Sequence, residues 1–194
     1  MSRHRSYDIT GIDLTDDSYT VEQSLIRNKY KALDAAGNVV LRGKQQLFKL
    51  KEKFPFVDGN GDEVFEVNAT GIVDIAGDYV LSDSRTGEEI VVLDNDFSLF
   101  QDTWRIRDAD TGEVLARIDS RGTATTLARN FLPLGWLIPH RYEITDGNGG
   151  HVGRIDGQLF SIRDRYEITI DDASSVPKEP IVAAAMVIDA IQGN

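Results

Sequence analysis

Two Asp/Gly clusters contain the residue types of this chain that most readily suggest chemistry. Asp58-Gly-Asn60-Gly-Asp62 and Asp108-Ala-Asp110-Thr-Gly112 both alternate oxygen-bearing side chains, as calcium-binding loops do. An EF-hand loop needs Gly at its sixth position and Glu at its twelfth. Counted from Asp58, these places hold Glu63 and Ala69, and the second cluster also departs from the pattern. Because hairpin turns select the same residues, we interpret both clusters as turns and expect no metal.

The remaining catalytic residue types stand in no recognisable arrangement. The three histidines, His4, His140 and His151, are not spaced as a metal-ligand set. The chain has no nucleophile elbow, phosphate-binding loop or dinucleotide fingerprint, and with no Cys it has no thiol chemistry. We therefore expect no catalytic residues, no cofactor and no enzyme activity. An enzyme with a barrel-mouth pocket near Trp136 and His140 is the alternative.

Positive charge is concentrated in one segment of an acidic chain. The net charge is −11 at pH 7, from 32 acidic and 21 basic residues. Residues 23–53 nevertheless carry eight cations and two acids, which gives +6. The predicted face for an anionic ligand consists of Arg27, Lys29, Lys31, Arg42, Lys44, Lys49, Lys51 and Lys53.

The strand period places these cations on the outward side of a sheet. A turn at residues 34–37 would set Lys29 opposite Arg42, and Arg27 opposite Lys44. Like charges directly across a ladder destabilise it, so an acidic group should neutralise them. Either carboxylates from the rest of the chain do so, or an anionic lipid headgroup at a membrane surface binds there. Nucleic acid is the less favoured partner, and the sequence identifies no protein partner.

One short pattern, written about six times, predicts the fold. Each copy has an aromatic residue, an apolar residue, an Asp and then a Gly, as in Tyr30 to Gly37 and Phe54 to Gly61, with Tyr166 to Asp171 as a degenerate last copy. Apolar alternation broken by Asp and Gly is typical of a β-hairpin. Six hairpin units predict about twelve antiparallel strands, enough to close a barrel and remove its edges.

The C-terminal segment predicts what fills that barrel. Residues 181–191 follow Pro180 and are apolar on almost every side, as in a helix buried all round. Such a helix is about 18 Å long, too short to span a bilayer. We therefore predict a single mainly β (α+β) domain over residues 1–194, with a loose lead-in at 1–18, the barrel at 19–176 and the central helix at 177–192.

The unit between Asp108 and Asp146 is longer than the others. Pro and Gly interrupt its apolar run, residues 131–138, so we do not expect a simple helix. We expect a lid over one barrel mouth, and an apolar surface that contacts a partner or membrane is the alternative. The candidate contact residues are Arg129, Phe131, Leu132, Trp136, Leu137, His140 and Arg141.

The acidity comes mainly from Asp, with 22 Asp against 10 Glu, while 14 Arg exceed 7 Lys. Abundant Asp, scarce Lys and no Cys are typical of cytosolic proteins of extreme halophiles, whose acidic surfaces stay hydrated in concentrated salt. The first residues lack the apolar stretch of a signal peptide, and no apolar run reaches the roughly 20 residues of a membrane span. We expect a soluble, cytoplasmic protein.

Several segments resemble the LURP-one-related family, which shares the tubby C-terminal-like fold with phospholipid scramblases. They are Phe48-Lys-Leu with Phe54, Phe97-Ser-Leu with Trp104, Phe160-Ser-Ile with Tyr166, and Ala185-Met-Val-Ile-Asp189. The resemblance covers about residues 19–192 and implies a twelve-stranded closed barrel around a hydrophobic C-terminal helix. Tubby proteins bind phosphoinositides and scramblases move lipids, but beyond the fold the resemblance implies little. We expect a non-enzymatic binding module, with a structural or regulatory protein-interaction domain as the alternative. The Cys-rich stretch and Pro-rich arm of scramblases are absent.

Overall fold

The structure is a computed structural model that describes residues 7–23, 29–44, 53–69, 79–98, 101–120, 141–157, 165–173 and 176–192. These residues form twelve strands and one helix. In chain order the elements are β1 (Ser18–Gln23), β2 (Lys29–Leu33), β3 (Val39–Lys44), β4 (Lys53–Asp58), β5 (Glu63–Ala69), β6 (Tyr79–Asp83), β7 (Glu89–Ser98), β8 (Gln101–Asp108), β9 (Val114–Ser120), β10 (Arg141–Asp146), β11 (His151–Gly157), β12 (Arg165–Ile170) and α2 (Lys178–Gln192).

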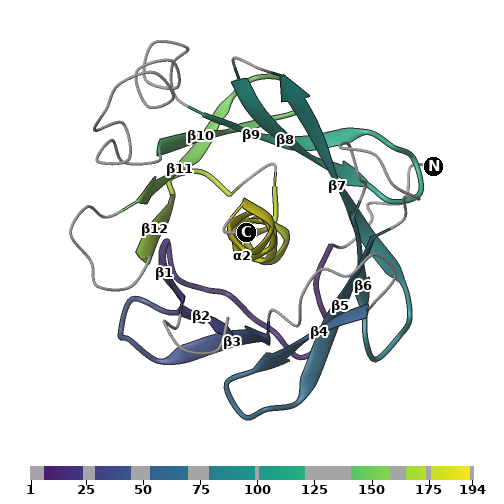
Figure 1. The fold of residues 1–194 in the computed structure, drawn as a ribbon, viewed down its shortest axis with the longest axis vertical. Helices are drawn as coiled ribbons and strands as arrows, with labels where there is room; N and C mark the ends of the chain where they lie inside the picture. Colours follow the sequence, from purple (N-terminus) through teal and green to yellow (C-terminus); the bar gives the residue numbers. More distant parts are fainter. Residues whose placement is uncertain are drawn as a thin grey trace.

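The strands close into one antiparallel barrel around the helix (Figure 1). Each strand pairs with its neighbours in sequence, and β1 also pairs with β12, which closes the barrel. Closure leaves no unpaired sheet edge among these strands. The predicted twelve-stranded closed barrel of hairpin units with a central C-terminal helix is confirmed.

Five hairpins turn between an Asp and a Gly, which lie three residues apart in three of the turns and four apart in the turns of Gly87 and Gly112. Each has an Asp at the end of its first strand and a Gly with positive φ in the turn, such as Gly37 at 85° and Gly112 at 71°. The second strand then carries one extra residue, Val40 in β3, opposite no partner in β2. The turn is also one residue longer than predicted, because Leu33 pairs with Val39, so turn and bulge together shift the register by two residues. The predicted pairing of Lys29 with Arg42 is therefore wrong, because Lys29 lies opposite Lys44 and Lys31 lies opposite Arg42.

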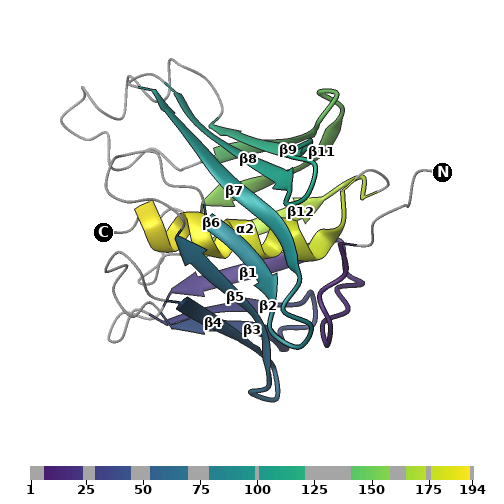
Figure 2. The same ribbon diagram turned by 90° about the vertical axis from the view of Figure 1, so that its right-hand side faces the viewer.

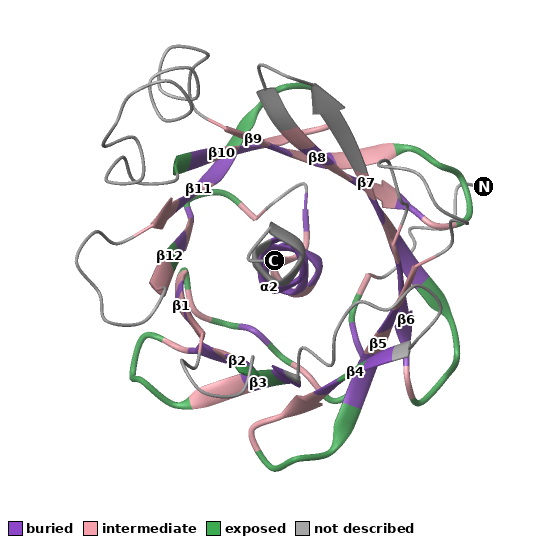
Figure 3. Cartoon of the chain, viewed as in Figure 1, coloured by how far each residue is buried: buried purple, intermediate pink, exposed green. Residues whose placement is uncertain are grey.

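The helix α2 runs through the middle of the barrel and forms much of the core. All residues from Ile181 to Ile188 are buried, and Figure 3 shows the helix coloured as buried inside the ring of strands. The buried side chains of the strands belong to the same hydrophobic cluster. Burying a large apolar side chain stabilises the folded state by about 1.5–3 kcal/mol. The almost uniformly apolar sequence of the helix therefore matches a position that is covered on every side.

The N-terminal segment from residue 7 to residue 17 lies across the end of the barrel that carries the hairpin turns, here called the turn end (Figure 2). Its Ile9 and Leu14 are buried. The backbone N–H of Leu14 donates to Glu179 at 3.0 Å, and the Nζ of Lys178 donates to Asp17 at 2.8 Å. From residue 7 onward the predicted loose lead-in is thus wrong, because carboxylates and apolar contacts at the turn end hold it.

Candidate functional site

The Asp/Gly clusters serve their own turns. The Oδ1 of Asp58 accepts the backbone N–H groups of Asn60, Gly61 and Asp62 at 2.8–2.9 Å. These bonds, that of Asp62 above all, hold the pKa of Asp58 below its usual value. Within the described ranges no group of three His, Asp or Glu side chains is placed to hold a metal ion. The Asp58 carboxylate therefore serves to hold the backbone of its own turn.

Asp108 has a second role at the turn end. It is 3% exposed, and its Oδ1 accepts the N–H groups of Asp110 and Thr111 at 2.9 and 2.7 Å. The hydroxyl of Tyr7 donates to its Oδ2 at 2.8 Å. Burial alone would raise the pKa of Asp108, but the bonds from Thr111 and Tyr7 outweigh it and lower the pKa to about 2. This carboxylate joins the N-terminal segment to a hairpin turn.

Part of the predicted basic face gathers at the end of the barrel opposite the turn end, here called the rim. Lys29 begins β2, Lys44 ends β3 and Lys53 begins β4, so all three lie at the rim. Lys29 is exposed and lies directly opposite Lys44 in the ladder. The side chains of Lys44 and Lys53 lie outside what the structure describes, as do all of Arg27, Lys49 and Lys51.

Away from the rim, the chain itself satisfies the cations of this face. The Nζ of Lys31 lies 2.9 Å from Glu22 Oε2. The Nη1 of Arg42 donates to the carbonyl oxygen of Gly59 at 2.8 Å. Neutralisation by the chain's own carboxylates is therefore the correct explanation for Lys31. Glu22 lies one residue before the cation-rich segment 23–53, and the β1–β2 register places it opposite Lys31.

Closure of the barrel adds a cation that sequence reasoning missed. The β1–β12 ladder sets Arg165 opposite Glu22, and with Lys31 and Arg42 they form one row across four adjacent strands. The Nε of Arg165 lies 3.9 Å from Glu22 Oε1, too far for a hydrogen bond. This Nε is buried and lacks a hydrogen-bond partner among the described atoms. The row thus carries three cations and one carboxylate.

His151 lies in an ion cluster on the outer face of β10 to β12. One ring nitrogen contacts Glu143 and the other lies 2.9 Å from Asp171 Oδ2. Hydrogen bonds to Asp171 first, and then to Glu143, raise the pKa of His151. Arg154 lies 3.3 Å from the same Asp171 and 3.2 Å from Asp156. Because the imidazole uses both nitrogens for carboxylates, this cluster joins neighbouring strands.

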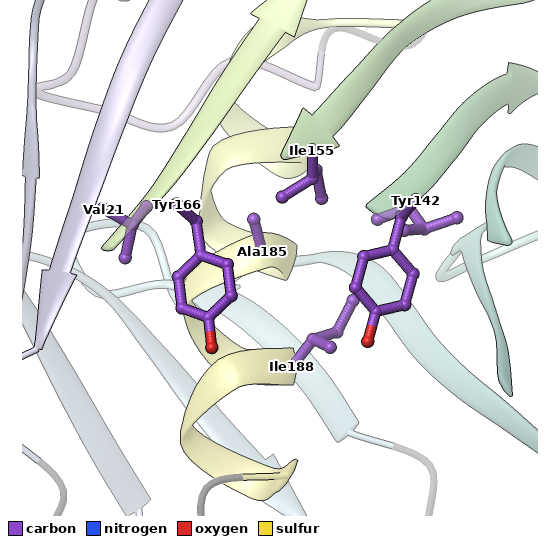
Figure 4. Close-up of a pocket in the computed structure, with 7 residues that line it drawn as sticks. Val21, Tyr142, Ile155, Tyr166, Ala185 and Ile188 are labelled. Carbon is purple, nitrogen blue, oxygen red and sulfur yellow. The ribbon is translucent and has the colours of Figure 1, made fainter. Parts of the chain in front are cut away.

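A small cavity of about 20 Å³ lies between α2 and the barrel wall (Figure 4). Its lining residues are Val21, Ile118, Tyr142, Ile155, Tyr166, Ala185 and Ile188. No carboxylate, imidazole or alcohol other than the two phenols belongs to this described lining, so the cavity offers no acid–base pair of the kind that hydrolysis needs. Trp136 and His140, the residues of the predicted enzyme pocket, lie outside the described residues.

The predicted apolar contact loop belongs to the segment 121–141, predicted to be a lid or a contact surface, and only Arg141 of that segment is among the described residues. Its last member, Arg141, begins β10 at the rim. The Nε of Arg141 lies 3.3 Å from Asp156 Oδ1, and the side chain is 62% exposed. In the part of the chain that the structure describes, no helix is long and apolar enough to cross a membrane.

Comparison with known proteins places the chain in a family. The model of the LURP-one-related family matches residues 39–189. The chain belongs to the LURP-one-related family. An X-ray structure of a protein from Arabidopsis thaliana has a similar fold, with a TM-score of 0.60 and 10% sequence identity over 96% of this chain and 99% of that one. The comparison with curated proteins found no match.

Family membership indicates the class of function. The LURP-one-related family is not a known enzyme family, and its domain suggests a non-enzymatic module that binds something. In this LURP-one-related chain, the described features that could meet a ligand are the cations at the rim and the apolar cavity beside α2.

Proposed function

We propose that this protein binds anionic lipid headgroups at a membrane surface through the rim of β2, β3 and β4. The observation that carries the proposal is the direct opposition of Lys29 and Lys44 in the β2–β3 ladder. Like charges across a ladder destabilise it unless something acidic lies close by. Among the described side chains no carboxylate bonds to Lys29, whereas Glu22 serves Lys31.

The distribution of charge between the two ends of the barrel supports binding through the rim. The rim gathers Lys29, Lys44 and Lys53 at neighbouring strand ends, and barrel closure brings Arg165 near them. The turn end instead carries an Asp in each of five hairpin turns, at Asp34, Asp58, Asp83, Asp108 and Asp146. An anionic surface attracts the first end and repels the second. The protein would therefore meet the membrane with its rim and hold the N-terminal segment away from it.

The test is flotation with anionic and neutral vesicles. Each Lys or Arg near an anionic membrane contributes about 1 kcal/mol, so Lys29→Glu should cost about 2 kcal/mol, or about thirtyfold in vesicle affinity. Arg117→Glu is the matched control, because Arg117 is an outward cation in β9, almost across the barrel. The vesicle affinity of the Arg117→Glu variant should change much less.

The same flotation measurement distinguishes membrane binding from a purely structural role of the rim cations. If the rim cations serve only contacts within the protein, the wild type should be absent from both floating fractions, and Lys29→Glu should lower the melting temperature. A wild type that floats equally with neutral and anionic vesicles would refute the role of the headgroup charge.

We also propose that the acidic composition adapts a cytoplasmic protein to concentrated salt. The support is the excess of acids outside residues 23–53, where 32 − 2 = 30 Asp and Glu face 21 − 8 = 13 Lys and Arg. At about 1 M salt the Debye length is about 3 Å. Headgroup binding under such conditions would require direct contact with Lys29 and its neighbours, because attraction at longer range would be screened.

A further inference from the structure

Glu22 lies between two cations on the outer face of the barrel wall, near the rim. The β1–β2 ladder sets Lys31 opposite Glu22 on one side, and the β1–β12 ladder sets Arg165 opposite it on the other. Strands β12, β1, β2 and β3 are neighbours in the wall (Figure 1), and Arg42 continues the row in β3. Glu22 is therefore the one acid in a row that carries three cations.

The carboxylate holds one of its neighbours closely and the other loosely. Its Oε2 lies 2.9 Å from the Nζ of Lys31, whereas its Oε1 lies 3.9 Å from the Nε of Arg165. The side chain of Glu22 is 16% exposed, and those of Lys31 and Arg165 are 39% and 42% exposed. The carboxylate is thus less accessible than the two cations beside it, and an external anion can approach both cations while Glu22 stays in place.

The row lies close enough to the rim to meet a membrane that is bound there. Glu22 is the second residue from the rim end of β1, and Lys31 is the third residue from the rim end of β2. Because a strand rises about 3.3 Å per residue, these residues lie about 3–7 Å from the strand ends. The long side chains of Lys31 and Arg165 can carry their charged ends across such a distance. A headgroup beside Lys29 therefore comes within reach of the row.

We propose that Glu22 is an internal counter-ion that competes with anionic lipid headgroups for Lys31, and so sets how anionic a membrane must be before the protein binds. This inference rests on the proposed membrane contact and names its regulation. Arg42 donates to the neutral carbonyl of Gly59, so its charge stays available to a headgroup. Lys31 must instead exchange a carboxylate held in the same molecule at high effective concentration. A membrane with few anionic lipids cannot drive this exchange.

Flotation of Glu22→Gln with phosphatidylcholine vesicles that contain increasing amounts of phosphatidylserine tests the inference. One charge near an anionic surface changes the affinity by about fivefold, so Glu22→Gln should bind about fivefold more tightly and float at a lower phosphatidylserine content than the wild type. Glu167→Gln is the matched control. Glu167 is an exposed acid of β12, two residues farther from the rim than Arg165, and its Oε1 accepts the Ser18 hydroxyl at 3.4 Å. Its replacement should change the affinity by less than about twofold.

A double-mutant cycle separates competition from simple addition of charge. In the wild type Lys31 is engaged by Glu22, and in Glu22→Gln it is available to the headgroups. Lys31→Gln should therefore weaken vesicle binding more in the Glu22→Gln background than in the wild type. Equal costs in the two backgrounds would overturn the competition, because the two charges would then act independently.

The remaining outcomes distinguish this inference from the membrane contact itself. Glu22→Thr, which suits a strand, replaces Glu22→Gln if the latter does not melt cooperatively. A Glu22 variant that folds and floats no better than the wild type would overturn the role of Glu22, while a wild type that still floats through Lys29 would leave the membrane contact in place. Failure of both the wild type and the Glu22 variant to float at any phosphatidylserine content would refute the membrane contact, and this inference with it.

Discussion

Replacing Asp108 by Asn should destabilise the protein by an amount that depends on pH. The carboxylate is 3% exposed, accepts two backbone N–H groups and the Tyr7 hydroxyl, and has its pKa lowered from 3.8 to about 2. Each unit of pKa shift corresponds to about 1.4 kcal/mol. The ionised Asp108 thus contributes about 2.5 kcal/mol at neutral pH. Asn has a similar shape but cannot ionise, so it loses this contribution.

The direction of the pH dependence follows from the lowered pKa. A depressed carboxyl pKa stabilises the folded state above the unfolded value of 3.8, and this contribution is lost as the pH falls through about 2. The difference between wild type and Asp108→Asn should therefore be about 2.5 kcal/mol at about pH 7 and about half of that at about pH 3. Urea unfolding at both pH values measures it.

Asp62→Asn provides the matched control, because Asp62 is an exposed turn residue of the β4–β5 hairpin. Its effect should stay within about 0.5 kcal/mol, as for most surface substitutions. A difference for Asp108→Asn that is the same at both pH values would refute the reasoning, because the loss would then come from shape or packing and not from the charge.

Three further predictions concern the core, the surface and one histidine. Deleting residues 178–194 should abolish the cooperative melt, because the helix buries five large side chains, Ile181, Val182, Met186, Val187 and Ile188. At about 1.5–3 kcal/mol each, their contribution is comparable to the whole stability of a typical domain, and a truncated chain that melts cooperatively would contradict this. Raising KCl from about 0.1 to about 3 M should raise the melting temperature, since salt screens the repulsion among surplus acids; a flat or falling series would remove the high-salt interpretation. The raised pKa of His151 means that its charged form stabilises the fold below its ordinary pKa of 6.5 and that this contribution is lost as the pH rises through the raised value. His151→Gln should therefore lower the melting temperature at about pH 6 more than at about pH 9, by a modest amount because the imidazole is 46% exposed, and an equal loss at both pH values would count against it.

Local patterns were enough to predict the hairpins and the central helix. An Asp that caps its own turn and a Gly with positive φ mark each hairpin within a few residues, as at Asp58 and Gly61. The helix was predictable because an apolar surface on all sides, Ile181 to Ile188, needs cover on all sides. Closure into a barrel followed from an even series of hairpins that would otherwise leave two exposed edges.

The register and the partners of the charged residues were not predictable in the same way. The turn pairs Leu33 with Val39, one position beyond the prediction, and the extra residue Val40 adds a second position, so Lys29 lies opposite Lys44 instead of Arg42. A bulge shifts the rest of its ladder and leaves little trace in residue type. The segment Arg-Tyr-Glu-Ile-Thr occurs twice in the sequence, at the start of β10 and of β12. Only the structure shows that both of its tyrosines, Tyr142 and Tyr166, line the cavity beside α2.

Contacts between distant parts of the chain were decided by the tertiary structure alone. Tyr7 bonds to Asp108, and Arg165 faces Glu22, across more than one hundred residues. Composition could only state that acids outnumber cations. Which acid neutralises which cation depends on distances of a few ångströms that exist only after the β1–β12 ladder closes the barrel. For this reason the sequence by itself determined that hairpins form a barrel around a helix and that one segment is basic. The folded structure decided that Lys31 is paired with Glu22 and that the Nε of Arg165 lacks a hydrogen-bond partner among the described atoms.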